Sequence, residues 1–272
     1  MTMEARLTPR GRRGWTKARI TGWVVLGFYA VAGFFLLKMI VFNFDPDLFD
    51  RYGPKLIDGL WVTLTLVCIS VGIGALLAFP VALARLSSSR LLGTLSYAYV
   101  YFFRGTPLLA QVFLIYYGAG QFRLGLEAAG LWWFFAEAFW CVLLTFTLNT
   151  AAYQAEILRG AIQSVPRGQT EAAQSLGVRP TVVFFKIVLP QALIIALRPL
   201  GNELILMIKG SAIASVVTIF DLMGATKLAF SRSFDFQVFI WAAILYLIMV
   251  EVLRRIWSRL ELRLTRHLKL SR

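Results

Sequence analysis

Residues 171–190 read EAAQSLGVRPTVVFFKIVLP and interrupt a chain that is otherwise strongly apolar. The chain is 58% hydrophobic and has a mean hydropathy of +0.70, whereas soluble domains are typically about 45–50% apolar. The stretch carries two notable charges, Glu171 and Lys186, and is punctuated by Gly177 and two prolines. A polar segment of this length between apolar runs indicates a structured loop with a purpose of its own.

The apolar excess is concentrated in blocks that predict membrane-spanning helices. About 20 helical residues cross a hydrocarbon core of roughly 30 Å, and backbone groups in lipid must be satisfied internally. The alternating segments of about ten residues that mark a membrane β-barrel are absent. The first block is too long for a cleavable signal peptide, and no small-residue cleavage site follows it. We therefore expect an all-α membrane protein with about six transmembrane helices, at 20–42, 59–84, 91–118, 131–157, 192–222 and 236–256.

The formal net charge of +14 is distributed unevenly along the chain. With six crossings, 20 lysines and arginines fall on one side of the membrane and five on the other. Because basic residues collect in cytoplasmic loops, both termini and the long polar loop are expected in the cytoplasm. We attribute the basic tails to topology and contact with lipid headgroups rather than to nucleic-acid binding.

Composition also divides the chain into parts. Two prolines and four aspartates between the first two apolar blocks favour an external loop, and polar residues enter the membrane helices only beyond it. We expect the working part to begin near residue 56. The predicted parts are a basic cytoplasmic tail at 1–19, an extra helix at 20–42, an external loop at 43–58, a transmembrane domain at 56–256 with a cytoplasmic loop at 158–190, and a basic cytoplasmic tail at 257–272.

The third block contains FFRGTPLLAQ at 102–111. Together, Arg104, Gly105 and Pro107 would break or kink a helix. Irregular backbone at membrane depth is tolerated only where protein or a water-filled cavity surrounds it. The stretch either breaks the span or ends it, with Arg104 among the headgroups.

The long loop contains start and stop signals that predict two short helices joined at a glycine. Pro166 starts a new element, and Thr170 could cap a helix that opens with Glu171, whose charge suits the positive end of the helix dipole. Gly177 follows where a left-handed cap favours glycine, and Pro180 starts a second short helix. Such an elbow is a rigid knob that another protein could grip, and the alternative is an ordinary interfacial loop.

The spacing E-A-A, three residues, G, nine residues, I-x-L-P resembles the signature loop of the inner-membrane permease subunits of bacterial ATP-binding-cassette (ABC) importers. Three further stretches, FRGTPLLAQ (103–111), LTFTLNTAAYQAEILRGAIQSVPRGQ (144–169) and GNELILMIKGSAI (201–213), are similar to the polar-amino-acid branch, especially the M-type permeases of the histidine/lysine/arginine/ornithine and opine systems. The resemblance covers roughly 56–270, and the helix at 20–42 departs from the usual five-helix type I core. The signature falls on Glu171, Ala172, Ala173, Gly177, Ile187, Leu189 and Pro190.

The resemblance implies a multi-pass subunit of the bacterial inner membrane that works in a permease pair, with itself or with a homologous Q-type subunit. Two cytoplasmic ATP-binding subunits would grip the elbow, and a periplasmic amino-acid-binding protein would deliver the substrate. ATP binding would then drive alternating access for a polar, cationic amino acid. The residues agree in one respect: no G-x-x-x-x-G-K-[ST] phosphate loop is present. The chain is therefore expected to be a non-catalytic subunit without a cofactor, powered by a partner.

Polar residues inside the apolar blocks are candidates for a substrate path. In the fourth block they recur at intervals of four, four and three residues, which places them on one helix face. Ionisable residues in membrane helices usually face a bundle interior or a cavity, and carboxylates there would suit a cationic substrate. Glu203 could instead be a structural ion-pair or hydrogen-bond partner, and Glu156 could have a headgroup or coupling role. The expected path residues are Asn149, Tyr153, Glu156, Asn202 and Glu203, with Thr145 on the same face of the fourth helix.

Other classes of protein fit the sequence less well. Cys68 and Cys141 lie in apolar blocks and the one histidine, His267, lies in the tail, so no disulfide framework, histidine-based metal site or proton relay is indicated. We find no channel filter and no paired nucleophile and base of an intramembrane enzyme. A secondary transporter with inverted repeats would need more helices and no ATPase partner.

Overall fold

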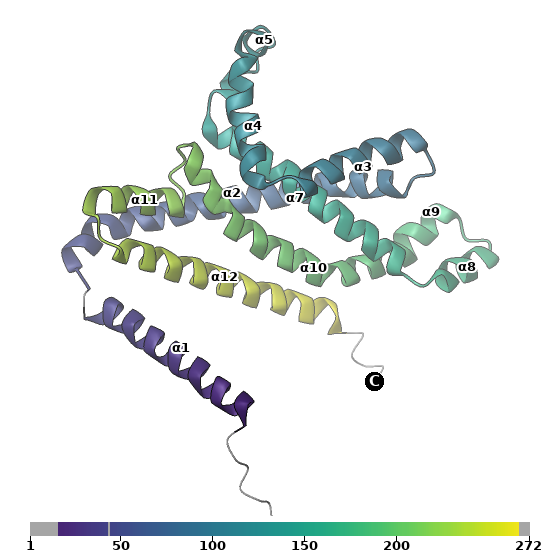
Figure 1. Ribbon diagram of the computed structural model, residues 1–272. Coiled ribbons are helices and arrows are strands. Elements are labelled where there is room, and N and C mark those ends of the chain that lie inside the picture. Colours follow the sequence, from purple (N-terminus) through teal and green to yellow (C-terminus); the bar gives the residue numbers. More distant parts are fainter. Residues whose placement is uncertain (1–15, 43, 267–272) are drawn as a thin grey trace, which may run out of the picture. The chain divides into compact units, whose positions relative to one another are not determined.

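The computed structural model describes residues 16–42 and 44–266, and every regular element in these residues is a helix (Figure 1). The chain forms two units, Met1–Phe49 and Asp50–Arg272, each taken here by itself. The first unit contains α1 (Lys17–Val41), which is 25 residues long. A helix that is apolar on all its faces suits a membrane span or a buried position, and α1 includes a candidate span at Lys17–Phe35.

The second helix, α2 (Pro46–Leu86), corrects the expectation of a loop at 43–58. Proline is well tolerated in the first turn of a helix because the N–H groups there have no helical partner. The carboxylate of Asp45 accepts from the backbone N–H groups of Asp47 and Leu48, at 3.0 and 3.1 Å from its Oδ1. The same proline and aspartates that favoured a loop therefore start a helix of 41 residues.

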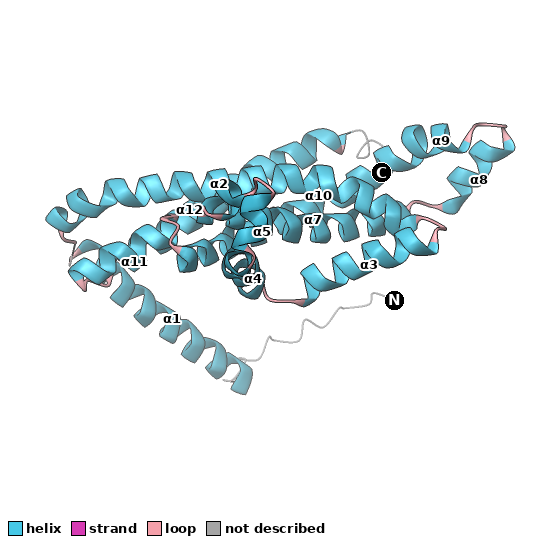
Figure 2. Ribbon diagram, turned by 90° about the horizontal axis from the view of Figure 1, so that it is seen from above, coloured by secondary structure: helices cyan, strands magenta, loops and turns pink. Residues whose placement is uncertain are grey.

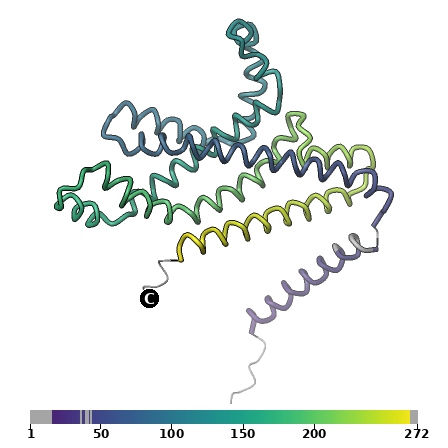
Figure 3. The backbone as a smooth tube through the Cα atoms, turned by 180° about the vertical axis from the view of Figure 1, so that it is seen from behind, coloured from purple at the N-terminus to yellow at the C-terminus, as the bar shows by residue number. Residues whose placement is uncertain are grey.

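The third apolar block is broken, as the sequence around Pro107 allowed. It forms α3 (Arg90–Gly105) and α4 (Leu108–Gln121), which are bent by 106° about two extended residues, Thr106 and Pro107. Figures 1 and 3 show α4 standing away from the long helices of the second unit. Two short helices, α5 (Arg123–Ala128) and α6 (Trp132–Phe135), follow it.

At the centre of the second unit lies α7 (Ala138–Ser164), which packs against α3, α4 and α10 (Figure 2). It buries several polar side chains, among them Thr145, Asn149 and Gln154. By length and hydropathy, the described residues hold four candidate spans, or five if the bent pair α3–α4 counts as one. The block expected at 131–157 is not among them, because the polar residues of α7 lower its mean hydropathy.

The long loop is helical almost throughout. It contains α8 (Arg167–Ser175), α9 (Pro180–Val183) and a π-helix η1 (Phe184–Val188) that leads into α10 (Leu189–Gly210). The expected cap at Thr170 is wrong, since α8 begins at Arg167 with Pro166 in the cap position. Pro166 fixes the start one turn earlier than the threonine would.

Beyond α10, the block expected at 192–222 continues as the 3-10 helix η2 (Ser211–Val217), which ends at Thr218 with φ +65°. Then come α11 (Leu222–Ser233) and α12 (Gln237–Leu264). Figures 1 and 3 place α11 at one end of the second unit and α8 and α9 at the other. Of the expected basic tails, residues 1–15 and 267–272 lie outside the described residues.

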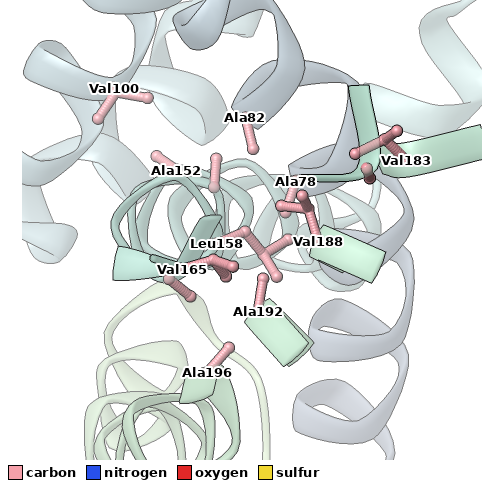
Figure 4. Packing of buried hydrophobic residues seen from close by; sticks show 13 residues of the cluster. Ala78, Ala82, Val100, Ala152, Leu158, Val165, Val183, Val188, Ala192 and Ala196 are labelled. Carbon is pink, nitrogen blue, oxygen red and sulfur yellow. The ribbon is translucent and has the colours of Figure 1, made fainter. Parts of the chain in front are cut away.

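Small side chains let the helices approach closely. A cluster of buried residues with many alanines joins α2, α7, α9 and α10 (Figure 4). Because lipid tails are as apolar as leucine, helix association in membranes depends on close packing rather than on apolar burial. Gly74 of α2 shows how close this packing is, since a Cβ there would lie 2.5 Å from Thr150 Cγ2 of α7. The labelled members are Ala78, Ala82, Val100, Ala152, Leu158, Val165, Val183, Val188, Ala192 and Ala196.

Candidate functional site

The elbow, which we define as residues 166–183, consists of α8, α9 and the ordered turn between them. Gly177 adopts φ +77°, a left-handed conformation that costs other residues free energy. The N–H of Gly177 donates to the Gln174 carbonyl at 2.9 Å, and the N–H of Val178 donates to the Ala173 carbonyl at 3.2 Å. These two bonds form a Schellman motif, which ends α8 at the glycine that the sequence indicated.

The signature residues divide into an exposed set and a buried set. Glu171, Ala172 and Gly177 are exposed on the elbow, whereas Ala173 is 7% exposed and joins the alanine-rich cluster. In the following helices Ile187 and Leu189 are half-buried and Pro190 is exposed. The elbow therefore presents one face outward and attaches to the bundle through the other.

A cavity of about 690 Å³ opens beneath the elbow. Its lining combines apolar side chains from α7, α9 and η1 with polar side chains from α8. Gln191 of α10 donates to Gln169 of α8, so the elbow is also linked to α10 outside the cavity. The lining residues are Ile162, Gln163, Val165, Arg167, Thr170, Gln174, Pro180, Val183, Phe184 and Val188.

A second, smaller cavity of about 190 Å³ lies beside the break between α3 and α4. It brings together three of the expected path residues, Asn149 and Tyr153 of α7 and Glu203 of α10. These side chains are far apart in the sequence, and the close packing of α7 against α10 places them at one cavity. The rest of the lining is Thr106, Leu108, Leu206 and Met207.

Glu203 is a buried carboxylate, 7% exposed, at this cavity. Thr150 Oγ1 donates to Glu203 Oε1 at 3.4 Å and accepts from Gln154 Nε2 at 3.0 Å. Gln154 Nε2 also donates to the Val71 carbonyl of α2 at 3.2 Å. Glu203 is thus both a cavity residue and a hydrogen-bond partner, and within the described part of the chain it forms no ion pair.

Two expected path residues lie away from the cavity. Glu156 accepts from Arg159 Nε at 3.0 Å through both carboxylate oxygens, and Arg85 Nε of α2 lies 3.7 Å from Glu156 Oε2. Asn202 is exposed and does not line the cavity. The ion pair with Arg85 links α7 to the end of α2, and the alternative of a headgroup or coupling role for Glu156 stays a prediction.

Sequence reasoning missed two contributors to this region. Gln111 of α4 is 2% exposed and donates from Nε2 to the Phe103 carbonyl at 2.9 Å. The guanidinium carbon of Arg104 lies 5.2 Å from the centre of the Tyr153 ring, so a positive charge stands beside the cavity. The helix-breaking stretch 102–111 pointed to both residues, but only the fold relates them to α7.

Apolar helices around a cavity that carries polar side chains, with an ordered elbow at one end, fit a membrane transport subunit. Comparison with known proteins supports this class. The chain belongs to the family of binding-protein-dependent transport system inner membrane components, whose profile matches residues 70–266. It is therefore a multi-pass permease subunit of the inner membrane, and in such transporters the ATPase is a separate subunit.

Similar proteins include the nopaline transport system permease protein of Agrobacterium fabrum, which is 45% identical over 83% of this chain and 94% of its own length. The histidine/lysine/arginine/ornithine transport system permease protein of Escherichia coli is 38% identical over 78% of this chain and 90% of its own. A crystal structure of an amino acid ABC transporter with histidines matches 81% of this chain and 99% of its own at 35% identity, with a TM-score of 0.71. An inward facing methionine ABC transporter, 21% identical with a TM-score of 0.64, shares the fold.

Proposed function

We propose that this chain carries a cationic amino acid or an opine across the bacterial inner membrane by alternating access, driven by partner ATPase subunits. The substrate class is supported by the relatives, whose names refer to nopaline, octopine and histidine/lysine/arginine/ornithine transport. Histidine, lysine, arginine, ornithine and opines share a basic or cationic nitrogen group together with at least one carboxylate.

The observation that carries the substrate class is the chemistry of the smaller cavity. Glu203 contributes a buried carboxylate, Tyr153 an aromatic ring, and Asn149 an amide whose Nδ2 donates to Phe103 O and Gln111 Oε1. The cavity thus offers hydrogen-bond acceptors, which is what an ammonium or guanidinium group needs. Arg104, on the face of Tyr153, is available for the carboxylate of the same substrate.

Uptake by cells that express the whole system tests this assignment. Glu203→Gln is expected to lower uptake of labelled arginine, ornithine, octopine and nopaline by at least about tenfold, because a buried charged partner is lost. Glu261→Gln is the matched control, since Glu261 accepts from Arg198 of α10 at 2.6 Å, away from the cavity. Equal uptake by the Glu203→Gln variant for every substrate would overturn the assignment.

We also propose that the movement driven by ATP reaches this chain through the elbow, which docks onto the cytoplasmic ATP-binding subunits. The docking residues are Glu171, Ala172, Ala173 and Gly177. The hinge between the elbow and α10 consists of Ile187, Leu189 and Pro190. Two features support this. The elbow is exposed on its outer face, and Ala173 and Val183 join it to the same cluster as Ala152 and Ala192. A displacement of the elbow would therefore be transmitted to α7 and α10, which carry the cavity residues.

Site-directed cross-linking tests the docking. In a chain with Cys68 and Cys141 replaced by serine, a Ser175→Cys variant should cross-link to a cysteine introduced into the ATP-binding subunit. Thr94→Cys, also exposed but on α3, is the matched control and should not cross-link. Equal cross-linking at the two positions would contradict a docking role for the elbow.

The remaining parts of the proposal concern assembly and topology. We infer a second permease subunit, identical or homologous, a periplasmic amino-acid-binding protein, and six crossings with both termini in the cytoplasm. The uneven distribution of basic residues and the candidate spans support this orientation. A membrane-impermeant maleimide should label an Ala129→Cys variant in intact spheroplasts, and a Ser88→Cys variant only after permeabilisation. The reverse pattern would invert the topology.

A further inference from the structure

The break between α3 and α4 leaves the Phe103 carbonyl oxygen without its ordinary helical partner. In a continuous helix the Phe103 carbonyl would accept from the N–H of residue 107, but Pro107 has none. Two side chains supply the donors instead: Gln111 Nε2 lies 2.9 Å and Asn149 Nδ2 lies 3.1 Å from Phe103 O. Buried backbone in a membrane needs such partners, so the two amides stabilise the break.

Gln111 is held in one orientation by this arrangement. Its Nε2 also lies 3.1 Å from the Thr106 carbonyl oxygen and 2.8 Å from Thr106 Oγ1. Because all of these acceptors belong to the break, the Gln111 amide directs its N–H donors there. Its remaining polar atom, Oε1, accepts from Asn149 Nδ2 at 2.9 Å.

The two bonds from Asn149 decide which of its polar atoms is left for the cavity. A primary amide has two N–H donors and one carbonyl acceptor. Both donors of Asn149 are engaged, by Phe103 O and by Gln111 Oε1. Since Asn149 also lines the smaller cavity, its Oδ1 is the atom it can offer there. Without the acceptor on Gln111, one of these two bonds is lost and only Phe103 O opposes a rotation that turns the NH₂ group of Asn149 inward.

We propose that Gln111 is a positioning residue, which fixes the amide of Asn149 and thereby makes the smaller cavity selective for a positively charged group. With Oδ1 turned inward, Asn149 and Glu203 both present acceptors to the N–H donors of an ammonium or guanidinium. With Nδ2 turned inward, Asn149 would oppose those donors. This inference rests on the proposed function, because it requires the cationic group of the substrate to enter this cavity.

The test measures binding to the purified transporter complex in nanodiscs, with labelled L-arginine and its neutral isostere L-citrulline as probes. The readout is the ratio of the citrulline Kd to the arginine Kd. Gln111→Met removes the acceptor with little change of shape, and it is expected to lower the ratio about tenfold, the value of a hydrogen bond to a charged group. Gln111→Glu keeps an acceptor oxygen toward Asn149, and it should hold the ratio at or above the wild-type value.

A double variant distinguishes positioning from a merely structural role. In Asn149→Ala the amide is absent, so adding Gln111→Met should leave the ratio where Asn149→Ala alone puts it, whatever happens to stability. An additional fall of the ratio in the double variant would overturn the inference, as would an unchanged ratio in Gln111→Met. Should Gln111→Met fail to assemble, Gln111→Glu decides: a lowered ratio overturns the inference, and a retained ratio alongside a collapsed ratio in Asn149→Ala supports it.

Glu203→Gln separates this inference from the proposed function. If the ratio is unchanged in Glu203→Gln, the cavity does not receive the cationic group and both proposals fall. If Glu203→Gln lowers the ratio while Gln111→Met does not, the substrate path stands and the positioning role of Gln111 alone is overturned.

Discussion

The elbow and the smaller cavity are built in opposite ways. The elbow is local: its turn is closed by bonds from Gly177 and Val178 to carbonyls three and five residues earlier. The cavity is assembled over long distances, by bonds that join Asn149 to Gln111 and Phe103, which precede it by 38 and 46 residues. The elbow exposes its outer face, whereas Asn149 and Glu203 of the cavity are each 7% exposed.

This difference predicts how each region responds to substitution. Damage to the elbow should leave the bundle folded and impair communication with a partner, because few of its side chains are buried. Damage to the packing around the cavity should instead lower the stability of the bundle. Substitutions in the two regions test this division, beginning with the largest expected effect.

Gly74→Leu is expected to have the largest effect, a loss of folded protein. A Cβ at Gly74 would lie 2.5 Å from Thr150 Cγ2 and 3.3 Å from the backbone nitrogen of Ala151, so α2 and α7 would have to separate. Overpacking of this kind typically costs about 1–3 kcal/mol, and the backbone contact raises the cost here. The measurement is the amount of monodisperse protein and its thermal unfolding temperature.

Gly72→Leu is the matched control, since Gly72 lies two residues earlier in the same helix and a Cβ there would have no heavy atom within 4 Å. It should retain wild-type stability. If both variants were equally stable, the close contact between α2 and α7 would not be a determinant of the fold.

Gly177→Val should reduce substrate-stimulated ATP hydrolysis by the assembled transporter at least about tenfold. A β-branched residue at φ +77° is strained by about 1–3 kcal/mol, so the turn would rearrange and displace the docking face. Thermal unfolding of the bundle should change little. The control is Gly168→Val, because Gly168 is an exposed residue of α8 with an ordinary φ. If the Gly177→Val transporter kept its full substrate-stimulated ATP hydrolysis, the hypothesis that the elbow couples the two activities would be wrong.

The same contrast explains what the sequence could and could not predict. Pro166, Gly177 and Pro180 act through the conformational preferences of their own backbone, which can be read from a short stretch of sequence. The two short helices and the left-handed turn between them were therefore predicted, and they are confirmed. The loop expected at 43–58 was wrong because the proline and aspartates of a loop also make a good helix start. The choice between a loop and a helix start depends on the apolar residues further along α2, which a short window around the proline does not contain.

The cavity shows the opposite limit. Helical spacing correctly placed Asn149 and Tyr153 on one face of α7, but it gave Glu156 the same status, and the structure engages Glu156 with Arg85 and Arg159 instead. Which polar residue meets a cavity depends on the neighbouring helix at that depth. The role of Gln111 could not be predicted from the sequence for the same reason, since its hydrogen-bond partners include residues of α3 and α7.

Leu176→Ala should have a smaller effect, again confined to coupling. Leu176 is 83% exposed at the tip of the elbow, next to Gly177, and so it has little to contribute to the stability of the bundle. If it packs against the ATP-binding subunit, truncation should weaken copurification of that subunit by a few-fold, as for a single apolar contact at an interface. Leu124→Ala, equally exposed on α5, should leave copurification unchanged.

A pH dependence of stability is expected at the end of the second unit opposite the elbow. Asp221 caps α11 between two spans and is fully buried, and burial raises its pKa from 3.8 to about 6, although Lys227 acts in the opposite direction. A pKa higher in the folded than in the unfolded chain means that folding favours the protonated acid. The stabilisation by protonated Asp221 is fully present below about pH 4 and is lost as the pH rises through 6. The free energy of unfolding falls by at most about 3 kcal/mol over this range.

Thermal unfolding of the purified complex at pH 5 and pH 7.5 measures this effect. Wild type should unfold at a temperature a few degrees higher at pH 5, and Asp221→Asn, which can still accept from the Gly224 N–H, should lose most of that difference. The Gly177→Val variant should keep it, since the elbow and Asp221 belong to regions that fold through separate contacts. A pH dependence that survives in Asp221→Asn would assign it to another group and weaken the division between the two regions.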